Sequence, residues 1–185
     1  MGRAKAFLPH ADGTTTFLAY AIRTCRAPGV AQVVVVGRPE DGALRAEVSH
    51  LQATFVANPD ADRGQLSSVL AGLDVADREF SADAIMVLPV DVPLITGDAV
   101  RALLLGAQAG AEPIVRATSN GRHGHPVIFK REVFDELRGT DPSVGARGVV
   151  RADASRVADV DVGDPGALLD VDTPEDYRRA FGRPV

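Results

Sequence analysis

The stretch Ala84-Ile-Met-Val-Leu-Pro-Val-Asp-Val-Pro-Leu-Ile95 decides the fold class of this chain. Its first five residues are apolar, and a short apolar run of this kind is typical of a parallel strand that is covered on both faces. Asp91 follows between two prolines, which cannot donate ladder hydrogen bonds and therefore end the strand. Ligands of parallel α/β sheets bind beyond the carboxyl ends of the strands, so Asp91 is a candidate ligand for a metal ion or a phosphate group. A solvated aspartate in an ordinary loop is the alternative interpretation.

Other parts of the chain repeat this alternation of apolar strand and amphipathic helix. Residues 32–37 and 54–57 are further apolar runs, and alternating strands and helices predict βαβ units around a parallel sheet. Beyond residue 112, residues 113–116 and 125–129, joined across Asn120-Gly121, predict a hairpin added to the sheet. Residues 157–162 form another predicted strand, and the predicted helices cover residues 16–27, 65–76, 96–109, 131–137 and those after Pro174. The sequence therefore predicts one domain over residues 1–185, α/β, three-layered and Rossmann-like, with a mostly parallel sheet.

The composition is that of an ordinary globular protein. Of 185 residues, 45% are hydrophobic and 24% are charged, which suffices for one domain with a substantial core. The net charge of −5 argues against a nucleic-acid partner. To bind a small anionic ligand, such a protein needs a local positive charge, for example a bound metal ion. The one cysteine, Cys25, excludes an internal disulfide and a cysteine-rich zinc site. No apolar run approaches the ~20 residues of a membrane span, and we expect a cytoplasmic protein with no membrane partner.

A second group of carboxylates stands in Leu168-Leu-Asp-Val-Asp-Thr-Pro-Glu-Asp-Tyr177. Alternation along an extended segment brings Asp170 and Asp172 to the same side, about 6–7 Å apart. Thr173 and Pro174 have a structural explanation as the N-cap and first residue of a helix. The paired aspartates do not, because two carboxylates on one face repel unless a cation compensates them.

The segment from Asn58 to Leu73 follows the predicted strand 54–57. Gly64 allows a turn into a helix whose first turn carries Ser67 and Ser68. Free backbone N–H groups and hydroxyls at a helix N-terminus suit a phosphate, a ribose or a base. Serine as an ordinary helix-start residue is an equally good interpretation for either one alone.

The segment Asn120-Gly-Arg-His-Gly-His-Pro126 carries two histidines in a Gly-rich turn. A His-x-His metal site needs a further ligand, and none lies nearby in the sequence. A tight turn that faces a cleft is the favoured interpretation. Neither a Walker loop nor a Gly-x-Gly-x-x-Gly fingerprint is present, and no Ser-His-Asp arrangement follows from the spacing.

The N-terminal segment Met1-Gly-Arg-Ala-Lys-Ala-Phe-Leu-Pro9 carries the basic pair Arg3 and Lys5. With the four blocks above, taken in order, it resembles the MobA-like nucleotidyltransferases, and more narrowly their molybdopterin cytidylyltransferase branch. The resemblance covers the whole chain and implies the three-layer nucleotide-diphospho-sugar transferase fold.

The resemblance also implies roles for residues at matching positions. Lys5 and Asp91 would be catalytic, Lys5 by neutralising the triphosphate and Asp91 by holding Mg²⁺. Asp170, with Asp172 as the other candidate, would complete the metal site. The implied nucleotide-binding residues are Arg3, Lys5, Asn58, Gly64, Ser67 and Ser68, and the implied acceptor-binding residues are Gly124, His125 and Pro126.

The N-terminal signature of the family is only partly present. The family begins with a strand and a Gly-rich loop that wraps the triphosphate, whereas this chain begins at the last residues of that signature. We expect that the domain is truncated at its N-terminus and that the natural protein is longer; a shortened, inactive descendant is the alternative. In either case the strands beside the missing one should have unpaired edges and exposed apolar surface.

The function that the resemblance implies is Mg²⁺-dependent transfer of CMP from CTP to molybdopterin with release of pyrophosphate. GMP from GTP is the alternative, although the guanylyl branch tends to carry Asp before the lysine, where this chain has Ala4. Within the same class of reaction, a sugar 1-phosphate or an isoprenoid precursor phosphate is a competing acceptor. Outside that class, the competing hypothesis is a non-catalytic protein that delivers the cofactor to a molybdenum hydroxylase.

Overall fold

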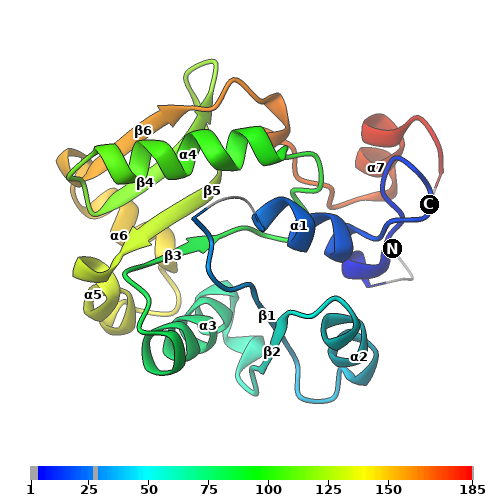
Figure 1. Ribbon diagram of the computed structural model, residues 1–185, viewed down its shortest axis with the longest axis horizontal. Coiled ribbons are helices and arrows are strands. Elements are labelled where there is room, and N and C mark those ends of the chain that lie inside the picture. The colour runs from blue at the N-terminus through cyan, green and yellow to red at the C-terminus, as the bar shows by residue number, and fades with distance from the viewer. Residues whose placement is uncertain (1–3, 27–28, 185) are drawn as a thin grey trace.

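The computed structural model describes residues 4–26 and 29–184. Strands and helices alternate through most of the chain (Figure 1). The strands are β1 (Val34–Gly37), β2 (Thr54–Ala57), β3 (Ala84–Val87), β4 (Ile114–Ser119), β5 (Arg122–Lys130) and β6 (Val157–Asp161). The α-helices are α1 (Phe17–Cys25), α2 (Gly42–His50), α3 (Gln65–Phe80), α4 (Gly97–Ala109), α5 (Phe134–Gly139), α6 (Ala146–Ala152) and α7 (Pro174–Phe181). The short 3₁₀ turns η1 (Lys5–Phe7) and η5 (Pro165–Leu168) both lie near the site described below.

The strands form two separate sheets. β1 and β2 pair in parallel, and the other sheet has the order β3-β5-β4-β6. β5 is antiparallel to both β3 and β4, whereas β4 and β6 are parallel. Three strands of this sheet therefore run in one direction and β5 runs in the other. The α/β prediction is confirmed, but the hairpin is not an addition at the edge, because β5 lies in the middle of the sheet.

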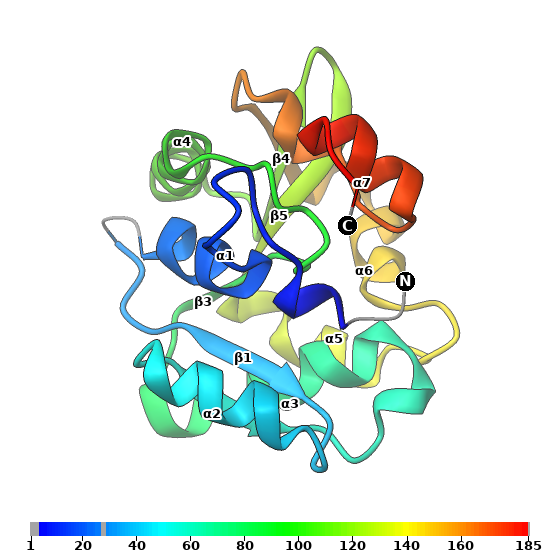
Figure 2. The same cartoon turned by 90° about the vertical axis from the view of Figure 1, so that its right-hand side faces the viewer.

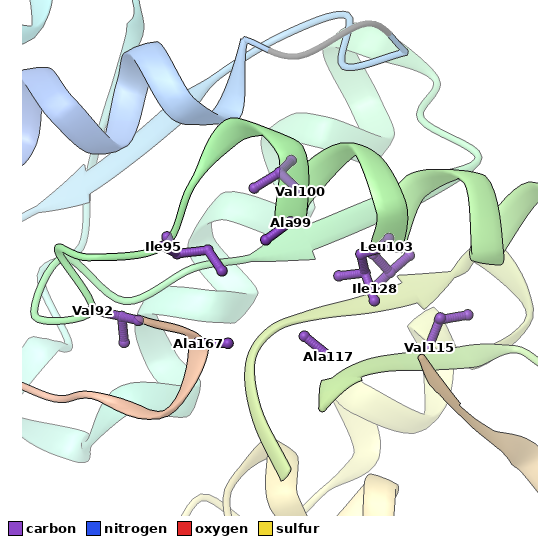
Figure 3. Close-up of a cluster of buried hydrophobic side chains, with 9 residues drawn as sticks. All are labelled: Val92, Ile95, Ala99, Val100, Leu103, Val115, Ala117, Ile128 and Ala167. Carbon is purple, nitrogen blue, oxygen red and sulfur yellow. The ribbon is translucent and has the colours of Figure 1, made fainter. Parts of the chain in front are cut away.

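Helices cover both faces of the main sheet and give the expected three layers. On one face, α4 packs onto β4, β5 and β6, and Figure 3 shows Leu103 of α4 beside Ile128 of β5. On the other face, Leu73 of α3 and Leu137 of α5 pack against Phe129 of β5. The candidate site lies at the ends of the strands that this core holds together.

A cavity of about 860 Å³ separates the two sheets, between β1 and β3. Its walls are the edges of these two strands, α1 and α4 on one face, and α3 on the other. Among the described residues, β1 pairs with β2 alone and β3 with β5 alone, so each has one unpaired edge. The expectation of unpaired strand edges is thus confirmed, and its consequence is that all four residues of β1 are only half-buried.

Local sequence signals place most element boundaries correctly. Thr96 caps α4 and Thr173 caps α7, where Asp176 completes a capping box. Asn120 and Gly121 both have positive φ, +51° and +71°, as a two-residue hairpin turn requires. Helices α2 and α6 were not predicted; α2 buries a short apolar stripe through Leu44 and Val48 on an otherwise polar helix, which weakens the sequence signal.

No helix in the described part of the chain is long and apolar enough to cross a membrane.

Candidate active site

Three segments that are distant in sequence meet beyond the carboxyl end of β3. Lys5 in η1 donates through Nζ to the Oδ2 atom of Asp91 at 3.0 Å and also to Asp172. The side chains of Lys5 and Asp91 are 31% and 28% exposed, and that of Asp172 is 64% exposed. The site is therefore open to solvent on one side and supported by protein on the other.

A small apolar cluster holds the three segments together. Leu8, Phe17, Val171 and Tyr177 are fully buried or nearly so, and Val90 packs against them. Leu8 follows Lys5 by three residues, Val90 precedes Asp91, and Val171 lies between Asp170 and Asp172. Each charged side chain of the site thus has a buried anchor within three residues of it. Figure 2 shows the resulting proximity of α7 to the N-terminal turn.

Backbone hydrogen bonds fix the carboxylates further. The turn at Asp91 is closed by a bond of 3.2 Å from the Val92 N–H to the Pro89 carbonyl, and the Val171 N–H donates to the Asp91 carbonyl at 2.7 Å. Val92 and Val171 are each 1% exposed. Because Val171 points into the core, its neighbours Asp170 and Asp172 turn toward the opposite side, as the alternation predicted.

The site contains more carboxylates than positively charged side chains. Burial opposes the charged form of Lys5, but its hydrogen bonds to Asp172 and Asp91 outweigh burial and raise the pKa of its ammonium above the ordinary value. Burial and the Asp91 carboxylate raise the pKa of Asp170. Asp170 has no salt bridge within the described segments, so the site keeps an excess of negative charge that a cation would relieve.

The donor set fits a divalent metal ion that is held jointly with a phosphate. Within residues 4–26 and 29–184, no three His, Cys, Asp or Glu side chains are arranged as a complete metal site. Asp91 and Asp172 do converge on one cation, the ammonium of Lys5. Mg²⁺ is usually bound by one or two carboxylates plus substrate phosphates and water, so this pair suffices when phosphate oxygens supply the rest.

The predicted nucleotide-binding residues form a polar cluster where β2 ends and α3 begins. Asn58 is 3% exposed, and its Nδ2 donates to Ser67 Oγ at 2.9 Å and to Ser68 Oγ at 3.0 Å. Gly64 has φ +97°, which explains why a glycine precedes the helix. Ser68 and Val90 line the same cavity, so this cluster faces the segment of Asp91 across the space between the sheets. Arg3 lies outside the described residues.

The predicted acceptor-binding residues lie within strand β5 and not in a turn, which corrects the prediction. The hairpin turn is at Asn120 and Gly121, so Gly124, His125 and Pro126 are in the strand. A Cβ at Gly124 would lie 2.2 Å from the carbonyl oxygen of Ala167, so only glycine lets η5 approach. The pairing of β5 with β4 is irregular between His123 and Val127, so the alternation of a regular strand does not put the two histidines on one face. His123 lies 3.4 Å from Asp159, which argues against a shared metal site for the two histidines.

The side chain of His125 faces the charged site. Burial lowers its pKa, and Asp170, Arg147 and Asp91 act on it electrostatically in that order. Its Nδ1 atom is buried and has no hydrogen-bond partner among the described residues. A buried polar atom without a partner is costly, and a ligand could satisfy it.

Two residues near the site were not predicted from the sequence. Arg147, in the first turn of α6, acts electrostatically on both Asp170 and His125. His10 is buried, stacks on Tyr20 and donates from Nε2 to the carbonyl of Pro93 at 2.8 Å, which supports the loop after Asp91. Neither residue lies in a recognisable motif. Their contacts are with residues distant in the sequence, so only the fold reveals them.

The fold and site are those of a nucleotidyltransferase: carboxylates and a lysine lie at the carboxyl edge of the sheet, and a polar cluster lies at a helix N-terminus. The chain belongs to the MobA-like NTP transferase family, whose domain matches residues 1–158. The nucleotidyltransferase fold expected from the resemblance is confirmed by the solved structures that it matches.

Three relatives illustrate the range of the family. The chain is 29% identical over 196 residues to the purine catabolism protein PucB of Bacillus subtilis (strain 168). This alignment covers 98% of this chain and 91% of PucB. It is 32% identical over 127 residues to a molybdenum cofactor guanylyltransferase of Cereibacter sphaeroides, covering 68% of this chain and 63% of that enzyme. Its structure matches that of Rv0371c from Mycobacterium tuberculosis H37Rv in complex with manganese, with a TM-score of 0.74, 28% identity, and coverage of 98% and 94% of the two chains.

Proposed function

We propose that this protein transfers CMP from CTP to the phosphate of molybdopterin and releases pyrophosphate, with Mg²⁺ as the metal ion. An oxygen of the acceptor phosphate attacks the α-phosphorus of the nucleotide while the bond from that phosphorus to the pyrophosphate oxygen breaks. The protein supplies position and charge, and no covalent intermediate is required. A bound Mg²⁺ would neutralise the phosphate oxygens and so favour departure of pyrophosphate.

The observation that carries this proposal is the convergence of Lys5, Asp91 and Asp172 on one point. Asp91 and Asp172 would hold the metal ion, and Asp170 would add negative charge beside it. The ammonium of Lys5 is within reach of the same region and would neutralise the triphosphate. The structure of Rv0371c in complex with manganese supports the use of a divalent metal ion.

The choice of nucleotide depends on the cluster of Asn58, Ser67 and Ser68. Their mutual hydrogen bonds hold two hydroxyls at the N-terminus of α3, where backbone N–H groups are also available to a ligand. Ala4 beside Lys5 favours CTP, whereas the guanylyltransferase relative makes GTP the second candidate. Comparing CTP with GTP in the assay described below distinguishes these two candidate donors.

The acceptor would bind along β5, opposite the nucleotide. His125 is acted on electrostatically by Asp170 and Asp91, and its imidazole would contact the acceptor beside these carboxylates. Gly124 and Pro126 would shape the surface on either side of it. A sugar 1-phosphate or an isoprenoid precursor phosphate would need the same phosphate contact, so acceptors are compared in one assay.

The proposal is tested by pyrophosphate release with molybdopterin and either CTP or GTP. We expect turnover with CTP, and Asp91→Ala should lower kcat/KM by roughly 10²–10³-fold, because a charge contact to the transition state is lost. Asp98→Ala is the matched control, since Asp98 is also an aspartate after β3 but its side chain is 98% exposed on α4. Pterin binding without turnover in the wild type would instead indicate a carrier protein, and turnover with a different phosphate acceptor would overturn the assignment of substrate.

A further inference from the structure

The position of Lys5 has a consequence for the order in which ligands bind. Its ammonium lies between Asp91 and Asp172, hydrogen-bonded to both. These are the two carboxylates that fit a divalent cation. The ammonium and a metal ion therefore compete for the same two carboxylates, because two cations held side by side there repel each other.

The backbone that carries the two carboxylates is held independently of Lys5. The Val171 N–H donates to the Asp91 carbonyl at 2.7 Å, which joins the two carboxylate-bearing segments directly. Val90 and Val171 both belong to the buried cluster around Leu8, Phe17 and Tyr177. Removing the lysine side chain should thus leave the two carboxylates in place and without their cation.

The side chain of Lys5 is held at its ammonium by the two carboxylates and is partly exposed to solvent. Lys5 is the first residue of a 3₁₀ turn that is fixed at the other end by Leu8, and its side chain is 31% exposed. A lysine ammonium is a point charge on a flexible stem, so it can leave one anion for another at small cost in geometry. A triphosphate that arrives with a metal ion would offer it such an anion.

We propose that Lys5 occupies the metal site of the nucleotide-free protein as a substitute cation. It lowers the affinity of the Asp91–Asp172 pair for a divalent ion alone. When the metal–nucleotide complex binds, the metal takes the carboxylates and Lys5 transfers to the phosphates. The protein therefore admits the metal together with the nucleotide and not before it. This inference rests on the proposed nucleotidyltransferase function, and it adds the exchange of one cation for another at that site.

The test measures Mn²⁺ binding to the nucleotide-free protein by electron paramagnetic resonance, which detects the free ion without reference to activity. Lys5→Met should tighten Mn²⁺ binding by about tenfold or more, because it removes a competing charge from the oxygens that bind the metal. Lys5→Arg should leave binding as weak as in the wild type, since the guanidinium retains the charge and can bond to both carboxylates.

Arg147→Met is the matched control for loss of a nearby positive charge. Arg147 acts electrostatically on Asp170 without a salt bridge to the pair within the described residues. It should change the affinity for Mn²⁺ far less than Lys5→Met does. An equal gain in both variants would show a general electrostatic effect and overturn the exchange. Thermal melts of each variant verify that it is folded.

The remaining outcomes separate this inference from the proposed function. Equal Mn²⁺ affinity in wild type and Lys5→Met, with loss in Asp91→Asn, would overturn the exchange and leave the metal site intact. No Mn²⁺ binding to any variant, Lys5→Met included, would overturn both the exchange and the proposed metal site.

Discussion

Strands β1 and β4 both begin with β-branched apolar residues but have very different surroundings. In β4, Ile114 and Val115 are fully buried, because β5 and β6 pair with its two edges and helices cover both faces. In β1, every residue is only half-buried, because one edge faces the cavity of about 860 Å³. The comparison teaches that an apolar run specifies a strand, whereas its burial depends on what pairs with both edges.

The candidate site also consists of two parts, one on the well-packed main sheet and one on the smaller sheet. The main sheet and the elements packed on it hold Asp91, Asp172 and His125, which would carry the chemistry and bind the acceptor. The smaller sheet and α3 hold Asn58 and Ser68, which would bind the nucleotide. We therefore expect the chemical part of the site to be the more rigid one and the nucleotide pocket the more adaptable one.

The largest difference between the two regions should appear when one valine is truncated in each. Val115→Ala should lower the free energy of unfolding by about 2–3 kcal/mol, because two buried methyl groups are lost and a cavity is left behind. Val35→Ala should cost about 1 kcal/mol, since Val35 is already half-exposed beside open space. Denaturant unfolding measures both, and equal costs would contradict the comparison.

A second contrast compares two glycines inside helices. A Cβ at Gly106 of α4 would lie 2.6 Å from Cγ2 of Val160, within the packed core, so Gly106→Ala should destabilise the protein by roughly 1–2 kcal/mol. A Cβ at Gly72 of α3 would lie 3.3 Å from Cγ2 of Val36, which can shift toward the cavity. Gly72→Ala should therefore gain roughly 0.5–1 kcal/mol from helix propensity. Thermal unfolding tests the opposite signs, and destabilisation by both would show that α3 packs as tightly as α4.

The smallest effect concerns pH. Burial lowers the pKa of His125 in the folded state, so between that pKa and about 6.5 the unfolded chain binds more protons than the folded one. Stability should rise as the pH rises toward about 6.5, and part of this rise should vanish in His125→Gln. His50→Gln, at an exposed position on α2 beside the smaller sheet, is the control and should leave the slope unchanged. An unaltered slope in His125→Gln would contradict the assignment.

Much of the fold could be predicted from local signals in the sequence. Apolar runs identified β1, β2 and β3, and cap residues such as Thr96 and Thr173 fixed the starts of helices. The central position of β5 could not be predicted, because strand order depends on packing between distant segments. Helix α2 was missed because two buried residues, Leu44 and Val48, give too weak a periodic signal.

The site was predictable to the same extent. Alternation around Val171 was enough to put Asp170 and Asp172 on one side of the chain. The pairing of Lys5 with Asp172, and the approach of Arg147 and His10, required the fold, since these residues come from opposite ends of the sequence or from unrecognised segments.

The most direct test of the metal–nucleotide site measures thermal stabilisation by CTP, GTP, UTP and ATP, each with and without Mg²⁺, in the wild type and in Asp91→Asn. We predict a Mg²⁺-dependent shift with CTP in the wild type that is lost in Asp91→Asn, because the neutral amide binds a divalent ion much more weakly than the carboxylate. An equal shift in both proteins would contradict this site, since nucleotide and metal would then bind without the carboxylate at the end of β3.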